Sequence, residues 1–159
     1  MGLKLAERLG FGFVDSDRYL AARHGAEVAD IVFKEGWEAF RRYESQALRE
    51  ICGRSRTVVA TGGGMVLAEG NRALMKENGL VLYLSAPAEV LGARLAADPQ
   101  NAQRPSLTGK SVLDEVSEVL REREPLYREA AGHIIEAGGE LGEVLERCLA
   151  VIPAGFTNS

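Results

Sequence analysis

The feature that most constrains this chain is a short apolar run that ends in three glycines. Residues 57–60 (TVVA) are continuous and rich in β-branched side chains, as is typical of a buried parallel strand. Thr61 and then Gly62, Gly63 and Gly64 follow directly. A flexible turn between a strand and a helix is one interpretation of these glycines. We favour a ligand site, because ligands of open α/β sheets bind at the carboxyl ends of strands and glycine lets a ligand reach bare backbone.

Strand and helix patterns alternate along the rest of the chain. Further strands are predicted at residues 12–14, 80–84 and 133–136, with helical stretches between them. This order indicates βαβ units, and therefore an α/β fold with a parallel sheet covered by helices on both faces. No linker divides the chain, so we expect one domain over residues 1–152 and a flexible tail over 153–159. The polar, proline-containing segment 98–111 is long enough to suggest a lid.

Two local patterns give further expectations. Val28, Ile31, Val32 and Phe33 are expected to form one apolar helix face. Pro125 is expected to interrupt or kink a helix over residues 111–131.

Composition excludes several classes of function. The net charge of -4 argues against a broad nucleic-acid surface. Cys52 and Cys148 belong to no CxxC or Cys/His cluster, which indicates free thiols in a reducing compartment rather than a zinc site. No apolar run approaches the roughly 20 residues of a membrane span, so we expect a cytoplasmic protein without membrane contact. Most of the basic residues are arginine, which suits the capture of carboxylate or phosphate, although a bias in base composition explains the excess equally well.

Charged side chains near two of the predicted elements are candidates for chemistry. Asp15 and Asp17 follow the strand at 12–14, where two acids can share a metal and a polar ligand. Capping of the next helix by Asp15, Ser16 or Asp17 is the simpler interpretation, and both roles are compatible. Arg41 and Glu44 lie three residues apart on one helix face, where a surface ion pair is the default interpretation.

Five motifs resemble one family, the shikimate kinases, in order and spacing over nearly the whole chain. They are residues 13–17 (FVDSD), 40–44 (FRRYE), 60–64 (ATGGG), 104–110 (RPSLTGK) and 121–127 (REREPLY). The resemblance implies a P-loop kinase fold of the nucleoside-monophosphate-kinase type. It implies an enzyme that transfers the γ-phosphoryl group of ATP to the 3-hydroxyl of shikimate in aromatic amino-acid biosynthesis, with Mg²⁺ as cofactor. We expect the protein to be a monomer.

The resemblance also implies roles for individual residues. Asp15 would help to position Mg²⁺, and Asp17 would bind the substrate hydroxyls and orient the attacking oxygen. Arg41 and Arg123 would clamp the shikimate carboxylate, with Glu44 holding Arg41. The N–H of Gly63 would contact shikimate, and Gly62 and Gly64 would leave room for it. Arg104 would close over the transferred phosphoryl group. Arg94 would lie along the adenine.

The sequence departs from the family in one motif. The phosphate loop G-x-x-x-x-G-K-S/T of the family is absent, and Gly109 is not part of one, because Arg104 stands where the first glycine is required. We therefore expect that residues upstream of Met1 supply a strand and this loop. Two alternatives remain at this point: a catalytically inactive shikimate-binding module without a P-loop, and a related small-molecule kinase such as a gluconate kinase.

Overall fold

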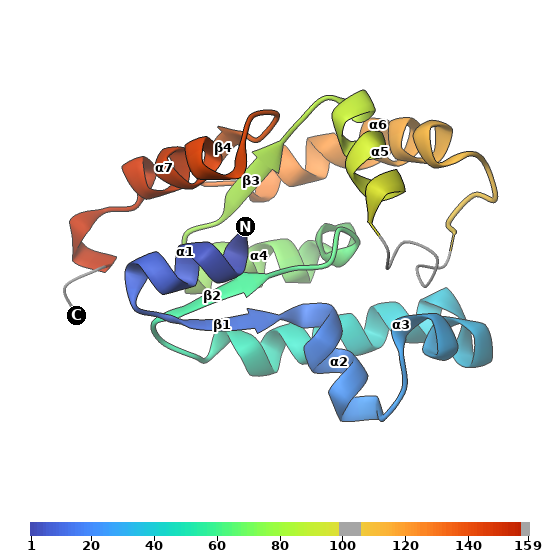
Figure 1. Cartoon of the computed structure of the whole chain (residues 1–159). Coiled ribbons are helices and arrows are strands. Elements are labelled where there is room, and N and C mark those ends of the chain that lie inside the picture. The colour runs from blue at the N-terminus through green and yellow to red at the C-terminus, as the bar shows by residue number, and fades with distance from the viewer. Residues whose placement is uncertain (99–105, 157–159) are drawn as a thin grey trace.

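A computed structural model of the chain describes residues 1–98 and 106–156 (Figure 1). Helices and strands alternate along these residues. In chain order they are α1 (Gly2–Leu9), β1 (Gly12–Asp15), α2 (Ser16–His24), α3 (Val28–Cys52), β2 (Thr57–Ala60), α4 (Glu69–Asn78), β3 (Leu82–Ser85), α5 (Ala88–Ala97), α6 (Val112–Ala130), β4 (His133–Glu136) and α7 (Leu141–Val151). Short 3-10 helices cover Met65–Leu67 and Ala154–Phe156.

The strands of the described residues form two parallel pairs. β1 pairs with β2 so that Asp15 lies opposite Ala60, and β3 pairs with β4 so that Ser85 lies opposite Glu136. Within the described ranges the two pairs are not hydrogen-bonded to each other. The predicted α/β class, with parallel strands flanked by helices, is confirmed, and its strands form two separate ladders (Figure 1).

Helix α1 packs against the strands through an apolar cluster. Leu5 of α1 is buried in a cluster with Ile135 of β4 and Val144 of α7. Val58 of β2 and Leu82 of β3 pack against the same cluster. This part of the core therefore connects the two strand pairs that lack a shared hydrogen-bond ladder.

A second buried cluster holds α6 beside the segment that follows the glycines. Its members come from α3, α4, α6 and the first 3-10 helix, namely Leu48, Met65, Val66, Met75 and Ala130. Leu126 and Tyr127 of α6 pack against this cluster. The position of α6 relative to the glycines is thus fixed by apolar packing.

The expected apolar face of residues 28–33 is wrong at Phe33, whose side chain is 90% exposed. Successive residues are rotated by about 100° around the helix axis, so Phe33, two residues after Ile31, lies on roughly the opposite face. Ile31 is 3% exposed and belongs to the core. The φ of 84° at Gly36 then breaks the helical backbone inside α3, a conformation that glycine adopts without steric cost.

Of the two effects expected at Pro125, the interruption is wrong, because α6 continues through it to Ala130, whereas the kink stays a prediction. A proline removes one backbone donor from a helix. The residues that follow it, Leu126 and Tyr127, pack against the second cluster, and Ala130 is buried in it. We attribute the continuity of α6 to this packing.

The flexibility of the expected tail over residues 153–159 stays a prediction. The described portion of the expected tail contains the 3-10 helix Ala154–Phe156, and residues 157–159 lie outside the described ranges. Among the described residues, no helix combines the length and the apolar character needed to cross a membrane.

Candidate functional site

The carboxyl ends of β1 and β2 bring the two acids and the three glycines together. The parallel register places Asp15 beside Ala60, so the segments that follow both residues are neighbours. The backbone N–H of Gly62 donates a hydrogen bond of 2.9 Å to the hydroxyl of Ser16, which is 2% exposed. This bond fixes the start of the glycine loop, residues 61–64, against the start of α2.

Asp15 caps helix α2. Its Oδ1 accepts hydrogen bonds from the backbone N–H groups of Asp17 and Arg18, each at 3.0 Å. The capping interpretation of the sequence is therefore confirmed for Asp15. Oδ2 takes part in neither bond, so capping and a metal-directed role remain compatible.

Asp17 and Glu44 converge on Gly62. A Cβ placed on Gly62 would lie 2.8 Å from Oδ1 of Asp17 and 3.3 Å from Oε1 of Glu44. Any side chain at residue 62 would therefore press on both carboxylates. This close approach explains why the chain needs glycine at this position.

The ion pair of Arg41 and Glu44 is partly buried, with a buried carboxylate and a guanidinium side chain that is 26% exposed. Arg41 Nη1 lies 2.5 Å from Glu44 Oε2, and the side chain of Glu44 is 3% exposed. The guanidinium of Arg41 also lies over the ring of Trp37, with 5.0 Å between its Cζ and the ring centroid. The default interpretation of a fully exposed surface pair is thus wrong, because Glu44 is buried and both side chains line one large cavity.

The environment of Glu44 works against its ionisation. Burial raises the pKa of Glu44 above 4.5, and the nearby charge of Asp17 adds to this effect. The hydrogen bond and charge of Arg41, and the charge of Arg123, lower the pKa without cancelling the effect of burial. Ionisation of the Glu44 carboxyl group is therefore favoured by the neighbouring guanidinium of Arg41.

Arg123 reaches the glycine loop from α6. Its Nη1 lies 3.8 Å from the position of a Cβ on Gly63. Arg41 therefore approaches the loop from α3 and Arg123 approaches it from α6. Two cations and two carboxylates are gathered around three glycines.

One cavity of about 910 Å³ contains all of these groups. Every predicted site residue within the described ranges lines it, namely Asp15, Asp17, Arg41, Gly62, Gly63, Gly64, Arg94 and Arg123. Arg104 lies outside the described residues, as does part of the predicted lid at 98–111. The described end of that segment is folded onto α6, because Glu115 accepts hydrogen bonds from Ser106 and from the N–H of Leu107.

Arg94 is tied to the loop that follows β4. Its Nη1 donates to the carbonyl of Ala137 at 2.8 Å, and its Nη2 donates to the carbonyl of Gly139 at 3.0 Å. These bonds fix the plane of the guanidinium at the edge of the cavity.

Sequence reasoning missed aromatic residues of the cavity wall. Trp37, Tyr83 and Tyr127 line the cavity beside the charged groups. The spacing in residues 121–127 contained a usable signal for one of them. Tyr127 follows Arg123 by four residues, which places both on one face of a helix.

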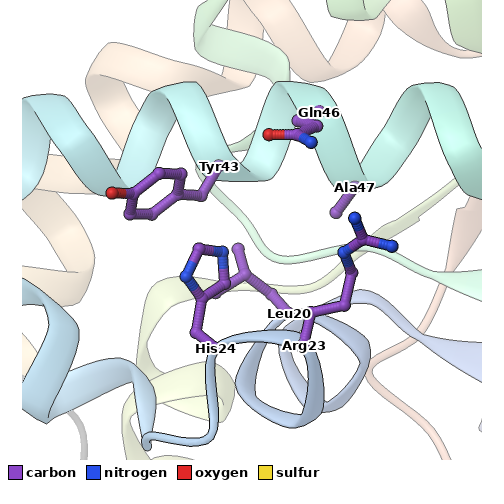
Figure 2. A pocket seen from close by; sticks show the side chains of 6 residues that line it. All are labelled: Leu20, Arg23, His24, Tyr43, Gln46 and Ala47. Carbon is purple, nitrogen blue, oxygen red and sulfur yellow. The ribbon is translucent and has the colours of Figure 1, made fainter.

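A second, smaller cavity lies between α2 and α3 (Figure 2). Its volume is about 150 Å³. The rings of His24 and Tyr43 lie in its wall with centroids 4.2 Å apart and planes tilted by 37°. None of the predicted site residues lines it. The larger cavity is therefore the candidate active site.

The donors available for a metal are few. Among the described residues, no group of three or more His, Cys, Asp or Glu side chains is arranged to hold a metal ion. Mg²⁺ keeps several waters and is bound through one or two carboxylates plus substrate phosphates, so Asp15 with Asp17 nearby fits Mg²⁺ bound together with a nucleotide.

Comparisons with known proteins identify one family. The sequence profile of the shikimate kinase family matches residues 1–153. A shikimate kinase of Nitratidesulfovibrio vulgaris is 50% identical over 152 residues, which are 96% of this chain and 87% of that relative. A shikimate kinase 2 of Syntrophotalea carbinolica is 53% identical over 152 residues, which are 96% of this chain and 88% of that relative.

Solved structures give the same result. The shikimate kinase of Acinetobacter baumannii in complex with shikimate superposes with a TM-score of 0.84 at 34% identity, over 94% of this chain and 83% of that one. The shikimate kinase of Bacteroides thetaiotaomicron gives a TM-score of 0.86 at 27% identity, over 94% and 88% of the two chains. With the predicted residues gathered in one cavity, these matches show that the chain belongs to the shikimate kinase family.

Proposed function

We propose that the large cavity is the active site of a small-molecule kinase that phosphorylates shikimate. The reaction is the transfer of the γ-phosphoryl group of ATP to the 3-hydroxyl of shikimate, which is the activity of the family to which the chain belongs. The observation that carries the proposal is the cavity wall itself. Arg41 and Arg123 face the same glycine loop as Asp17, so an acid with hydroxyl groups can be held at both ends.

Arg41 and Arg123 bind the carboxylate of shikimate. Guanidinium groups form strong, directional hydrogen bonds with carboxylates. Glu44 holds Arg41 in place through their ion pair, and the N–H of Gly63 supplies a further donor. Because Gly63 has no side chain, the substrate can approach its backbone closely.

Asp17 orients the hydroxyl that attacks the phosphorus atom. Phosphoryl transfer depends mainly on positioning and on neutralisation of charge, so an acid that fixes the attacking oxygen and accepts its proton meets the first need. Asp15 would hold Mg²⁺ through water, and the ion would neutralise the phosphate charges. The unused Oδ2 of Asp15 supports this assignment.

Arg94 and Arg104 act on the nucleotide. The guanidinium of Arg94 is held flat by the carbonyls of the loop after β4, which suits contact with the adenine. Arg104 closes over the transferred phosphoryl group, an assignment that rests on the motif at residues 104–110 alone.

The phosphates of ATP are held by a strand and a phosphate loop outside these 159 residues. The sequence has no G-x-x-x-x-G-K-S/T motif. In the described ranges β2 and β3 each have a single strand neighbour, which leaves one edge of each strand for pairing with a further parallel strand. The intact mass of the protein from its own cells tests this. We expect about 1.5–2 kDa more than 17.2 kDa, for roughly 15–18 residues. A mass of 17.2 kDa favours the shikimate-binding module without turnover.

Arg123→Ala tests the substrate assignment. The change is expected to weaken shikimate binding by about 2 kcal/mol or more, or roughly 30-fold, because it removes one partner of a charge pair. Titration calorimetry with shikimate measures the affinity. Arg121→Ala is the matched control, since Arg121 lies on the same helix, is exposed and does not line the cavity.

Unchanged affinity in Arg123→Ala removes Arg123 from the site, and tighter binding of gluconate than of shikimate contradicts the choice of substrate.

A further inference from the structure

Tyr127 connects α6 to the glycine loop. Its hydroxyl donates a hydrogen bond of 2.8 Å to the carbonyl oxygen of Gly63. Its ring stacks on Tyr83 of β3, with centroids 5.1 Å apart and planes at 29°. The ring is thus fixed by the core, while the hydroxyl extends to the loop.

Arg123 and Tyr127 bracket the same glycine. They lie four residues apart on α6, which places them one turn apart on one helix face. A Cβ on Gly63 would lie 3.1 Å from the hydroxyl of Tyr127 and 3.8 Å from Nη1 of Arg123. Tyr127 and Arg123 are therefore the side chains of α6 that approach Gly63, in addition to the apolar packing that positions the helix.

The other side of the loop carries the second arginine. Gly64 is packed against the guanidinium of Arg41, which belongs to α3. The carbonyl of Gly63 and the N–H of Gly64 belong to one planar peptide group, so the orientation of that carbonyl also orients the backbone of Gly64. Because three successive glycines leave the backbone with wide conformational freedom, an external hydrogen bond has a larger effect on this loop than on an ordinary one.

We propose that Tyr127 is a positioning residue for the carboxylate site of the substrate. By holding the carbonyl of Gly63, its hydroxyl fixes the glycine loop between Arg41 and Arg123 and so sets the relative position of the two guanidinium groups. The inference rests on the proposed function, in which these two groups bind one carboxylate. Tyr127 itself does not touch the reacting atoms.

Tyr127→Phe tests this role in the full-length protein, because it keeps the stacked ring and removes only the hydroxyl. The dissociation constant for shikimate is expected to rise about 3- to 10-fold, the range for one net hydrogen bond. The affinity for MgATP is expected to stay within twofold. Fluorescence of Trp37, the one tryptophan of the sequence and a residue of the same cavity wall, gives a direct signal for shikimate binding.

Tyr19→Phe is the matched control. Its hydroxyl donates a hydrogen bond of the same length, 2.8 Å, to Glu50, and it does not line the large cavity. Both variants are expected to lower the melting temperature by similar amounts. Only Tyr127→Phe is expected to change the affinity for shikimate.

Three results would overturn the proposal. They are an unchanged affinity for shikimate in Tyr127→Phe, an equal loss of shikimate and MgATP affinity in that variant, and an equal loss of shikimate affinity in Tyr19→Phe. Absence of shikimate binding in the unaltered protein overturns the proposed function and this inference together. If Tyr127→Phe does not fold, Gly63→Ala disturbs the same contact from the loop side, and an unaltered affinity for shikimate in that variant also overturns the proposal.

Discussion

Asp17→Asn is expected to lower kcat for shikimate phosphorylation by about 10²- to 10⁴-fold, the range typical for loss of a general acid or base. Asparagine has nearly the same shape and still binds a hydroxyl group, but it cannot accept the proton of the attacking oxygen. The affinity for shikimate is therefore expected to change much less than kcat. Steady-state rates with MgATP and shikimate, together with the dissociation constant for shikimate, separate the two effects.

Asp30→Asn is the control for Asp17→Asn. Asp30 is an exposed residue in the first turn of α3, and it does not line the large cavity. The kcat of the Asp30→Asn variant is expected to equal that of the unaltered protein. A loss smaller than about tenfold in Asp17→Asn would show that another group takes the proton, and a large loss of shikimate affinity with normal kcat would assign Asp17 to binding alone.

Local patterns in the sequence predicted much of the fold. The strands at 57–60 and 133–136 and the helix at 69–78 have the bounds expected from periodicity and from their flanking glycines. These signals are local, because a strand or helix is specified by residues close in sequence. Phe33 shows the limit of this reasoning, since apolar character alone does not place a residue on the buried face of a helix.

The residues of the site were predictable, whereas their contacts were not. The motifs identified the acids, the arginines and the glycines that line the large cavity. The sequence did not predict that Glu44 is buried, that Ser16 binds the N–H of Gly62, or that Tyr127 binds the carbonyl of Gly63. Each of these contacts joins elements that are far apart in the sequence or depends on what covers them, so no local pattern contains it.

Gly64 is the glycine at which an added Cβ would come closest to another residue, and that residue is Arg41 of the site. A Cβ there would overlap Nη1 and Cζ of Arg41, which no real contact allows. The backbone of Gly64 has φ -85° and ψ -6°, a conformation that alanine adopts without strain. Gly64→Ala must therefore act by displacing the guanidinium of Arg41, not by distorting the loop.

Gly64→Ala is expected to weaken shikimate binding on the order of 10- to 100-fold, the effect of losing hydrogen bonds from one charged group. The variant is also expected to lose stability in a pH-dependent way. Arg41 lowers the pKa of Glu44, so its displacement raises that pKa further above 4.5. A raised pKa of an acid in the folded state stabilises the fold below the unfolded pKa, and this stabilisation is lost as the pH rises. The loss of unfolding free energy in Gly64→Ala should thus be larger near pH 7 than near pH 4.5.

Urea unfolding at both pH values and calorimetry with shikimate measure the two effects in Gly64→Ala. Gly70→Ala is the matched control, because Gly70 is exposed on α4 and a Cβ there meets nothing within 4 Å. That control is expected to gain about 0.5–1 kcal/mol of stability, as alanine does relative to glycine in a helix, and to bind shikimate normally. Normal shikimate affinity in Gly64→Ala would mean that Arg41 is not a ligand of the carboxylate. A stability loss that does not depend on pH would contradict the link between Arg41 and Glu44. It would show that ionisation of the buried Glu44 carboxylate does not depend on the guanidinium of Arg41.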